Sequence, residues 1–126
     1  MRLSVTHAEA GQIRALLAAM PEGPRAALAA GSGRAADTRC AALSSGGRCQ
    51  IYEARPFVCR THGAPIRMTR NSLPVIESCV RNFVAVTPDP DCVLDQTTLS
   101  ALTLAVDRSE GGDGSRIDLA ELIASC

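Results

Sequence analysis

Four cysteines in the middle of the chain carry the residue types that could hold a metal ion. Cys40, Cys49 and Cys59 follow one another at intervals of nine and ten residues, and Cys79 comes twenty residues later. Zinc and iron–sulfur sites use thiolates that converge from loops held by rigid elements. These cysteines lie on or next to expected turns, so their positions point to a thiolate site for zinc or iron.

The spacing leaves two other uses of these cysteines open. None of the intervals is the C-x-x-C knuckle that marks many metal sites. Buried thiols are common in protein cores, and cysteines also form disulfide or redox pairs. Residue type and spacing together therefore leave metal ligands, inert thiols and paired thiols as alternatives.

An arginine stands beside three of these cysteines. Arg39 and Arg48 precede the first and second, and Arg60 follows the third. A nearby cation lowers the pKa of a thiol and so favours the thiolate that binds metal. Adjacent side chains point to opposite sides of an extended segment, so this pattern favours thiolates without placing the guanidinium groups at the sulfur atoms.

Other residues are weaker candidates for the same site. His62 lies one helical turn after Cys59 and could be a ligand or a donor to one, although a histidine in such a turn is more often partly exposed. Cys92, in an Asp/Pro turn, is a spare ligand or a packed residue. Cys126 ends the chain, where fraying is expected. Glu53 and Arg55 could form a hydrogen-bond network beneath the cysteines.

The sequence contains no motif of a known catalytic centre. It has no G-x-S-x-G, no glycine-rich phosphate loop before a helix and no paired carboxylates in a catalytic setting. We therefore assign no catalytic residue, and a binding protein fits the residues better than an enzyme.

Charge and hydropathy narrow the choice of partner and compartment. The 13 basic residues, all arginine, balance 13 acidic residues, which removes the electrostatic argument for a nucleic-acid or anionic-membrane partner. No signal-peptide pattern is visible, and no apolar run approaches the roughly 18 residues of a spanning helix. We expect a cytoplasmic protein whose cysteines stay reduced and whose partner is a metal ion. No protein partner is indicated.

Two helices are expected to support the cysteine region from its N-terminal side. Thr6 to Glu9 forms a capping-box pattern that starts a helix near His7. Pro24 can open a second helix that runs to Ala30 and ends at Gly31 and Gly33. The first helix should run to Pro21 and bury one apolar face, made of Ala10, Ile13, Leu16, Leu17 and Met20.

The cysteine region itself is expected to consist of short elements. A turn at residues 44–47 precedes a brief extended segment at 49–52, and a short helix at 56–61 breaks at Gly63. Residues 66–68 and 73–76 form a small hairpin, with Pro74 confining the second arm to a sheet edge.

Two further helical segments close the chain. The first starts at Asp95, carries Leu99, Leu102 and Val106, and ends at glycines 111, 112 and 114. The second is a short amphipathic segment at residues 117–123. The predicted fold is a mainly α, small and irregular single domain over residues 1–126, with a minor β-hairpin and partly stabilised by metal. Its parts are a helical support (6–30), a cysteine core (40–83) and C-terminal helices (95–125).

The stretch from Cys40 to Arg60 resembles the core signature of the YkgJ-type cysteine-cluster proteins, a family of zinc- or iron-chelating domains. That signature is a cysteine, a leucine-containing segment with glycine, a second cysteine, Tyr-Glu, Arg-Pro and Cys-Arg. The family's later cysteine, followed shortly by Asn-Phe, resembles Cys79 with Asn82 and Phe83, and the segment from Val5 to Met20 resembles the helix before the core. The matching residues of the core are Cys40, Leu43, Gly47, Cys49, Tyr52, Glu53, Arg55, Pro56, Cys59 and Arg60.

The resemblance implies metal binding, with one departure from the family pattern. Members typically carry a C-x-x-C-x-x-C-C cluster ahead of the first helix, and this chain begins at Met1 without it. The resemblance therefore implies a reduced site, no site, or a truncated chain. It carries over as ligands only Cys40, Cys49, Cys59 and Cys79.

Three hypotheses follow. In the first, four thiolates hold zinc or an iron species, Arg55 and Arg60 offset the negative charge, and Tyr52, Phe57 and Phe83 shield the ion. In the second, an iron–sulfur cluster or a thiol pair cycles between redox states. In the third, the chain is accessory to a protein-modifying enzyme of the methylation type, because related cysteine clusters occur in proteins linked to that modification.

Overall fold

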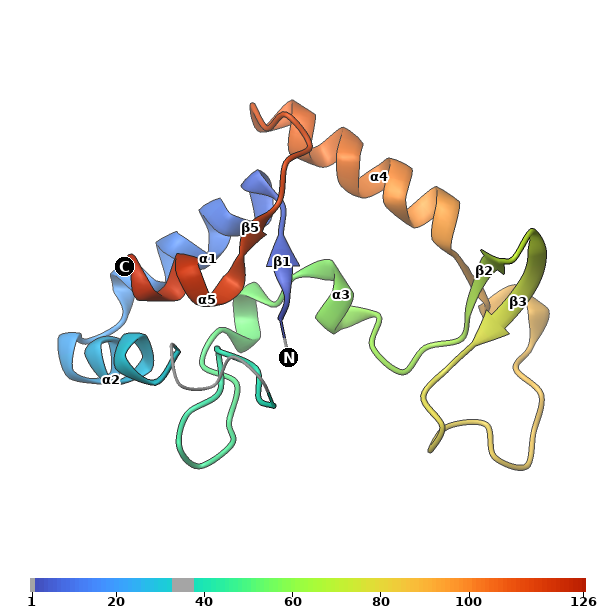
Figure 1. The fold of residues 1–126 in the computed structure, drawn as a ribbon, viewed down its shortest axis with the longest axis horizontal. Helices are drawn as coiled ribbons and strands as arrows, with labels where there is room; N and C mark the ends of the chain where they lie inside the picture. Colours follow the sequence, from blue (N-terminus) through green and yellow to red (C-terminus); the bar gives the residue numbers. More distant parts are fainter. Residues whose placement is uncertain (1, 33–37) are drawn as a thin grey trace. The chain divides into compact units, whose positions relative to one another are not determined.

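The computed structural model describes residues 2–32 and 38–126 (Figure 1). The chain divides into two compact units, and each is described by itself. Unit 1 consists of Met1–Pro56 and Val106–Cys126, and unit 2 of Phe57–Ala105. Helices predominate among the described elements and one small hairpin is present, so the prediction of a mainly α fold with a minor hairpin is confirmed. Metal stabilisation and the single domain over 1–126 stay predictions.

Unit 1 begins with the predicted capping box. The Glu9 amide donates to Thr6 Oγ1 at 3.2 Å, and the Thr6 amide donates to the Glu9 carboxylate at 2.9 Å. These two bonds satisfy donors that the first helical turn leaves without partners. Helix α1 (His7–Ala19) follows and buries Ala10, Ile13 and Leu17.

Helix α2 (Glu22–Ser32) is longer than predicted. It begins two residues before Pro24 and continues through Gly31. Proline is tolerated in the first helical turn because its missing N–H would have no partner inside the helix there. The proposed stop at Gly33 lies outside the described residues.

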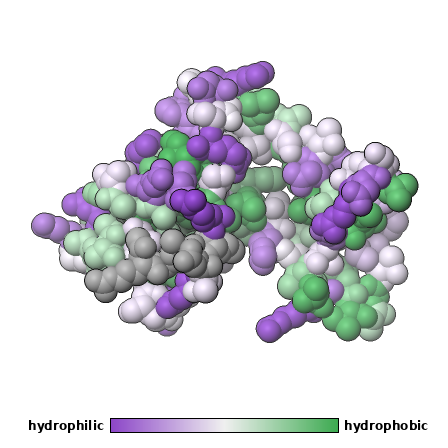
Figure 2. Space-filling model, in the orientation of Figure 1, coloured by the Kyte–Doolittle hydropathy of each residue, from purple (hydrophilic) through white to green (hydrophobic). Residues whose placement is uncertain are grey.

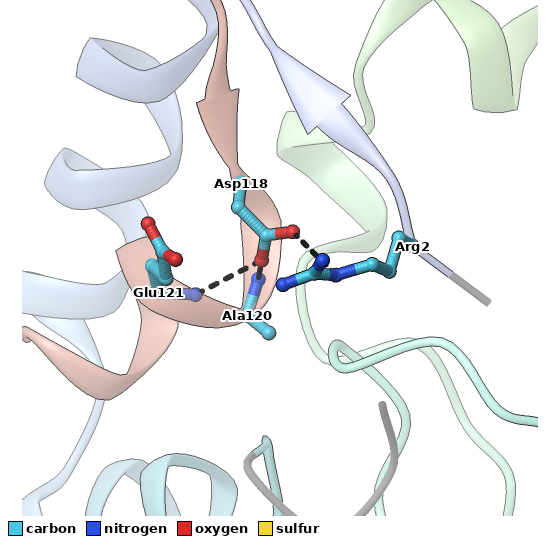
Figure 3. Close-up of polar contacts among 4 residues, drawn as sticks. All are labelled: Arg2, Asp118, Ala120 and Glu121. Atoms are coloured by element: carbon cyan, nitrogen blue, oxygen red, sulfur yellow. Dashed lines mark hydrogen bonds and ion pairs between the residues drawn. The ribbon is translucent and has the colours of Figure 1, made fainter. Parts of the chain in front are cut away.

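The two ends of the chain meet in unit 1. Strand β1 (Ser4–Val5) pairs antiparallel with β5 (Ile117–Asp118). Asp118 then caps helix α5 (Leu119–Ala124): its carboxylate accepts from the Ala120 and Glu121 amides at 2.8 and 3.2 Å and lies 3.5 Å from Arg2 Nε (Figure 3). The short strand pair and its cap bring α5 onto the core.

The core of unit 1 is aliphatic. Helix α5 supplies three of its members, and α1 packs against both α5 and the short 3₁₀ helix η1 (Tyr52–Ala54). Among the described residues, the core cluster consists of Val5, Ala10, Ile13, Leu17, Leu28, Ala41, Ala42, Ile51, Ala54, Leu119, Leu122 and Ile123.

A buried carboxylate that sequence reasoning missed also holds unit 1 together. Asp107, near the end of helix α4 (Gln96–Ser109), is fully buried. Its oxygens accept from the Ala8 amide in the first turn of α1 and from the Gly114 amide, each at 3.0 Å. The Ala8 amide, above all, holds the pKa of Asp107 below its ordinary value against the opposing effect of burial. Gly112 lies so close that a Cβ there would overlap the carboxylate.

Unit 2 contains the predicted hairpin. Strands β2 (Ile66–Arg70) and β3 (Leu73–Glu77) pair antiparallel across a two-residue turn. The turn residues Asn71 and Ser72 have φ of 50° and 64°, as the primed turns of tight hairpins require. Both arms are longer than predicted: the first continues to Arg70 and the second to Glu77.

A strand that the sequence did not reveal completes this sheet. Strand β4 (Leu94–Asp95) pairs parallel with β2, so the order is β3-β2-β4. Strand β3, which carries Pro74, is therefore at the edge as predicted. Asp95 ends the strand and accepts from the Thr98 amide at 2.9 Å, which caps the start of α4.

Unit 2 buries very little apolar surface. Over residues 57–105 only Pro65 is buried. Val80 and Val84 are 91% and 80% exposed, and Leu102 on α4 is 59% exposed. Figure 2 shows apolar (green) surface over the segments around β2 and β3. Hydrogen bonds and turns, more than side-chain packing, define this unit.

Among the described residues, no helix has both the length and the apolar character needed to cross a membrane.

Candidate metal centre

Backbone hydrogen bonds hold Cys40 and Cys49 in one closed loop of unit 1. Cys40 opens a turn in which the Leu43 amide donates to the Cys40 carbonyl at 3.2 Å. Leu43 then pairs antiparallel with Cys49 as an isolated bridge, and the Gln50 amide donates to the Ala42 carbonyl at 2.8 Å. This segment therefore combines a turn with a single strand-like pairing.

The glycine-rich turn closes this loop. The Ser44 amide donates to the Arg48 carbonyl and the Gly47 amide to the Ser44 carbonyl, each at 2.9 Å. Gly47 has a φ of 80°, in the region that glycine adopts without steric cost. The turn predicted at residues 44–47 is confirmed.

The extended segment predicted at 49–52 is largely wrong. Only Cys49 pairs, and the chain turns at once into η1, where the Ala54 amide donates to the Ile51 carbonyl at 3.0 Å. Ile51 is buried in the core. Burial of this side chain outweighs the alternating pattern, because an extended strand here would need a partner along its full length.

Cys40 is partly buried and lines a surface cavity of about 460 Å³. Helix α2 contributes Pro24, Ala27 and Leu28 to the wall. The neighbouring Arg39 donates from its guanidinium to the Ser44 carbonyl at 3.1 Å. This arginine therefore braces the loop that carries Cys40.

In unit 2, the segment after Cys59 lies against the turn that begins at Cys79. Cys59 is in helix α3 (Phe57–Arg60), after which the chain reverses at Gly63, with a φ of 88°. The Gly63 carbonyl accepts from the Asn82 side-chain amide at 2.8 Å, and the Asn82 backbone amide donates to the Cys79 carbonyl at 2.8 Å. A Cβ on Gly63 would lie 3.6 Å from the Cys79 Cβ. The short helix and its break at Gly63 occur as predicted, with narrower bounds.

The weaker ligand candidates are exposed. His62 is at the surface, and Cys92 is exposed at the end of a 3₁₀ turn, η2 (Pro90–Cys92). Cys126 is exposed and its Sγ donates to the Leu122 carbonyl at 3.2 Å.

Of the residues expected to surround the ion, Tyr52 and Arg55 interact with each other. The Arg55 guanidinium lies 3.7 Å from the Tyr52 ring centroid, and Arg55 Nε donates to the Tyr52 carbonyl at 3.0 Å. Tyr52 is 55% exposed, Glu53 and Arg60 are also exposed, and Phe57 is half-buried. Their proposed roles in shielding and charge compensation stay predictions.

The four principal cysteines divide equally, two in each unit. No disulfide joins any of the six cysteines, all of which are in the described part of the chain. Within residues 2–32 and 38–126, no group of three or more His, Cys, Asp or Glu side chains is close enough to hold a metal ion. The thiol donors fit zinc or iron in type, and the four-cysteine ligand set stays a prediction.

Comparison with known families decides the affiliation. Residues 1–80 match the model of the CxxCxxCC family, described as a putative zinc- or iron-chelating domain. The chain belongs to this CxxCxxCC family. The matched region contains α1, α2 and all four principal cysteines. The cysteine run that gives the family its name does not occur in the 126 residues. A search of curated proteins and a search of solved structures each found no match.

The family description agrees with the predicted chemistry at the level of zinc or iron chelation. It does not select the ligands or the pathway. The structure adds Asn82 and Gly63, which sequence reasoning did not place beside a cysteine. Gly63 was visible only as a helix breaker, and Asn82 only as part of the family resemblance.

Proposed function

We propose that this CxxCxxCC-family protein binds a zinc or iron ion through the thiolates of Cys40, Cys49, Cys59 and Cys79. Two features of the structure support this. Hydrogen bonds order the segments that carry each pair of cysteines, and no disulfide uses the thiols in the described chain. The family description names zinc and iron as the candidate metals.

The observation that carries the proposal is the missing core of unit 2. Hydrophobic burial stabilises small units poorly, and those with little core usually depend on disulfides, metals or association. Residues 57–105 bury only Pro65 and contain no disulfide. A metal held by Cys59 and Cys79 would supply the missing stabilisation, since the binding energy of a structural metal is also folding energy.

The residues around the thiols serve binding more than catalysis. A zinc ion would act as a structural cross-link without redox chemistry, while iron would add the capacity to transfer electrons. Arg39, Arg48 and Arg60 are sequence neighbours of the first three cysteines, and a cation near a thiol favours the thiolate. We propose a cytoplasmic location, where the thiols needed for coordination stay reduced.

The direct test is the metal content of protein purified without oxygen. We expect near one zinc or iron per chain by elemental analysis. Visible absorbance with brown colour and inorganic sulfide would instead support an iron–sulfur cluster. A chain with neither metal at a substantial fraction of one per chain would contradict the proposal.

Substitutions test the ligand assignment. Cys49→Ser and Cys59→Ser should each lower metal content and melting temperature together. Cys126→Ser is the matched control, because it removes an exposed thiol at the chain end. Full occupancy in both test variants would show that the assigned ligands are wrong even if metal is bound.

A further inference from the structure

We infer that Asn82 is a positioning residue that docks the Cys79 turn onto the segment following Cys59 before any ion binds. The inference rests on the proposed function and deepens it. It concerns unit 2 alone. In it, the neutral side chain of Asn82 helps to align the thiols of Cys59 and Cys79, which are twenty residues apart.

The first step of the argument is the pair of bonds that Asn82 makes. Its backbone amide closes the turn from Cys79, and its side-chain amide reaches the Gly63 carbonyl, each at 2.8 Å. One residue therefore both shapes the Cys79 turn and attaches it to the other cysteine-bearing segment. The β2–β3 hairpin lies between these two points in the sequence, and its pairing of Ile66 with Glu77 brings the two flanking segments near each other. The Asn82 bonds then fix how the Cys79 turn lies against Gly63.

The second step is the space at Gly63. A Cβ built there would lie 2.9 Å from Asn82 Nδ2 and 3.6 Å from the Cys79 Cβ. The φ of 88° is also in the region that side chains disfavour. Gly63 thus allows the backbone carbonyl to be approached closely, and a larger residue would push the two segments apart.

The third step is the lack of apolar support around this contact. Val80 and Val84 are almost fully exposed and Phe83 is 40% exposed. Side-chain packing around residues 80–84 therefore contributes little to the alignment of the Cys79 turn. The hairpin brings the Cys79 turn near Gly63, and the Asn82–Gly63 hydrogen bond fixes its orientation there.

The chemical requirement at position 82 is a donor of the right length. Asparagine has an N–H₂ donor, and aspartate has almost the same shape but only acceptors when ionised. In Asn82→Asp, a carboxylate would face the Gly63 carbonyl and the contact would be repulsive. Asn71→Asp is the matched control, because Asn71 is exposed in the same unit, as Asn82 is, but its side chain makes no hydrogen bond within the described residues.

The first experiment measures the contact in the wild-type, metal-free, reduced protein. We expect the Asn82 side-chain amide protons, observed by NMR, to exchange with water at least severalfold more slowly than those of Asn71. Equal exchange of the two side chains would overturn the inference without recourse to any variant.

The second experiment measures zinc affinity by competition with a chelator of known affinity. We expect Asn82→Asp to weaken binding by about tenfold, the upper range for loss of one hydrogen bond, and Asn71→Asp to leave it unchanged. The thiolate-to-metal absorption of the cobalt form should keep its intensity per ion in Asn82→Asp, since the ligands themselves are intact. Wild-type affinity in Asn82→Asp would overturn the inference.

A double-mutant cycle separates positioning from a general effect on folding. If Asn82 acts through Cys79, then Asn82→Asp should have no further effect on zinc affinity in a chain that already carries Cys79→Ser. A full additional loss in that background would show a merely structural role. If the wild-type chain binds no zinc or iron, the proposed function fails and the positioning role fails with it. Normal zinc binding with an unaffected Asn82→Asp variant would contradict the inference alone.

Discussion

The two units reach order by different physical means. The described part of unit 1 packs a core of buried aliphatic residues around α1, α2 and α5, and its two principal cysteines are tied together by backbone hydrogen bonds. Unit 2 buries only Pro65, and the side chain of Asn82 links the two cysteine segments that the β2–β3 hairpin brings near each other. A hydrogen bond between backbone groups survives most substitutions, whereas a hydrogen bond made by a side chain is lost when that one residue is replaced. The comparison indicates that a bound metal should contribute most to the stability of the unit with the smaller core, which is unit 2.

Removal of the metal is expected to have the largest effect, and the effect should be unequal. A chelator, with the thiols kept reduced, should abolish hydrogen-exchange protection in β2 and β3 while α1 and α5 keep most of theirs. Structural zinc contributes on the order of 10 kcal/mol in small metal-dependent peptides, which exceeds what unit 2 can gain from burial. Exchange measured by mass spectrometry on the full chain tests this. Parallel loss in both units would break the comparison.

Truncation of a core residue is expected to have the next largest effect. Ile13→Ala, at a fully buried site in α1, should lower the free energy of unfolding of unit 1 by about 2–5 kcal/mol through lost burial and a cavity. Leu102→Ala on α4 is the control, since Leu102 is 59% exposed. It should change stability by less than about 0.5 kcal/mol. Denaturant titration followed by circular dichroism measures both, and equal losses would refute the difference in packing.

The effect of removing a helix cap on stability should also differ between the two units, by a smaller amount. Asp118 caps α5, which buries three core residues, and Asp89 accepts from the Asp91 amide in η2, which buries none. Asp118→Ala should cost about 1 kcal/mol, the usual effect of losing an N-cap. Asp89→Ala should have a smaller effect on the melting temperature, because little packing depends on its turn. The reverse order in thermal melts would be inconsistent with our account.

The acid response of unit 1 should depend on Asp107. Its folded-state pKa lies below the ordinary value of 3.8, so its contribution to stability is present above that value. That contribution is lost as the pH falls through the lower folded-state pKa. In Asp107→Asn the melting temperature should be lower at neutral pH and should fall less steeply between about pH 5 and pH 2.

Glu110→Gln provides the control for this pH response, since it removes an exposed carboxylate from the end of the same helical region. Its melting temperature should follow the wild-type pH profile. A wild-type profile for Asp107→Asn would show that the buried carboxylate does not stabilise the folded state.

Elements whose signals are local were predictable from the sequence. The capping box at Thr6 and Glu9, the turn at 44–47 and the hairpin with Pro74 at its edge all occur as expected. In each case the interacting groups are only a few residues apart, so residue type and spacing are sufficient. The two-residue strand β4 left no such signal, because its only support is pairing with β2.

The periodic helices show where local reasoning stops. Helices α1 and α4 both carry apolar residues at helical spacing, yet α1 buries Ile13 and Leu17 while Leu102 of α4 is exposed. Periodicity describes which residues share a face of a helix. Whether a neighbouring element covers that face depends on segments elsewhere in the chain.

The sequence by itself determined the helical and hairpin elements, the turns that carry the cysteines and the family to which the chain belongs. Tertiary structure alone decided that Asp107 joins the start of α1 and that Asn82 reaches Gly63. The physical reason is sequence separation: these bonds join residues 99 and 19 positions apart. Propensity and capping act over about one helical turn, whereas a buried carboxylate or a docking amide is defined only by the partner that folding brings to it.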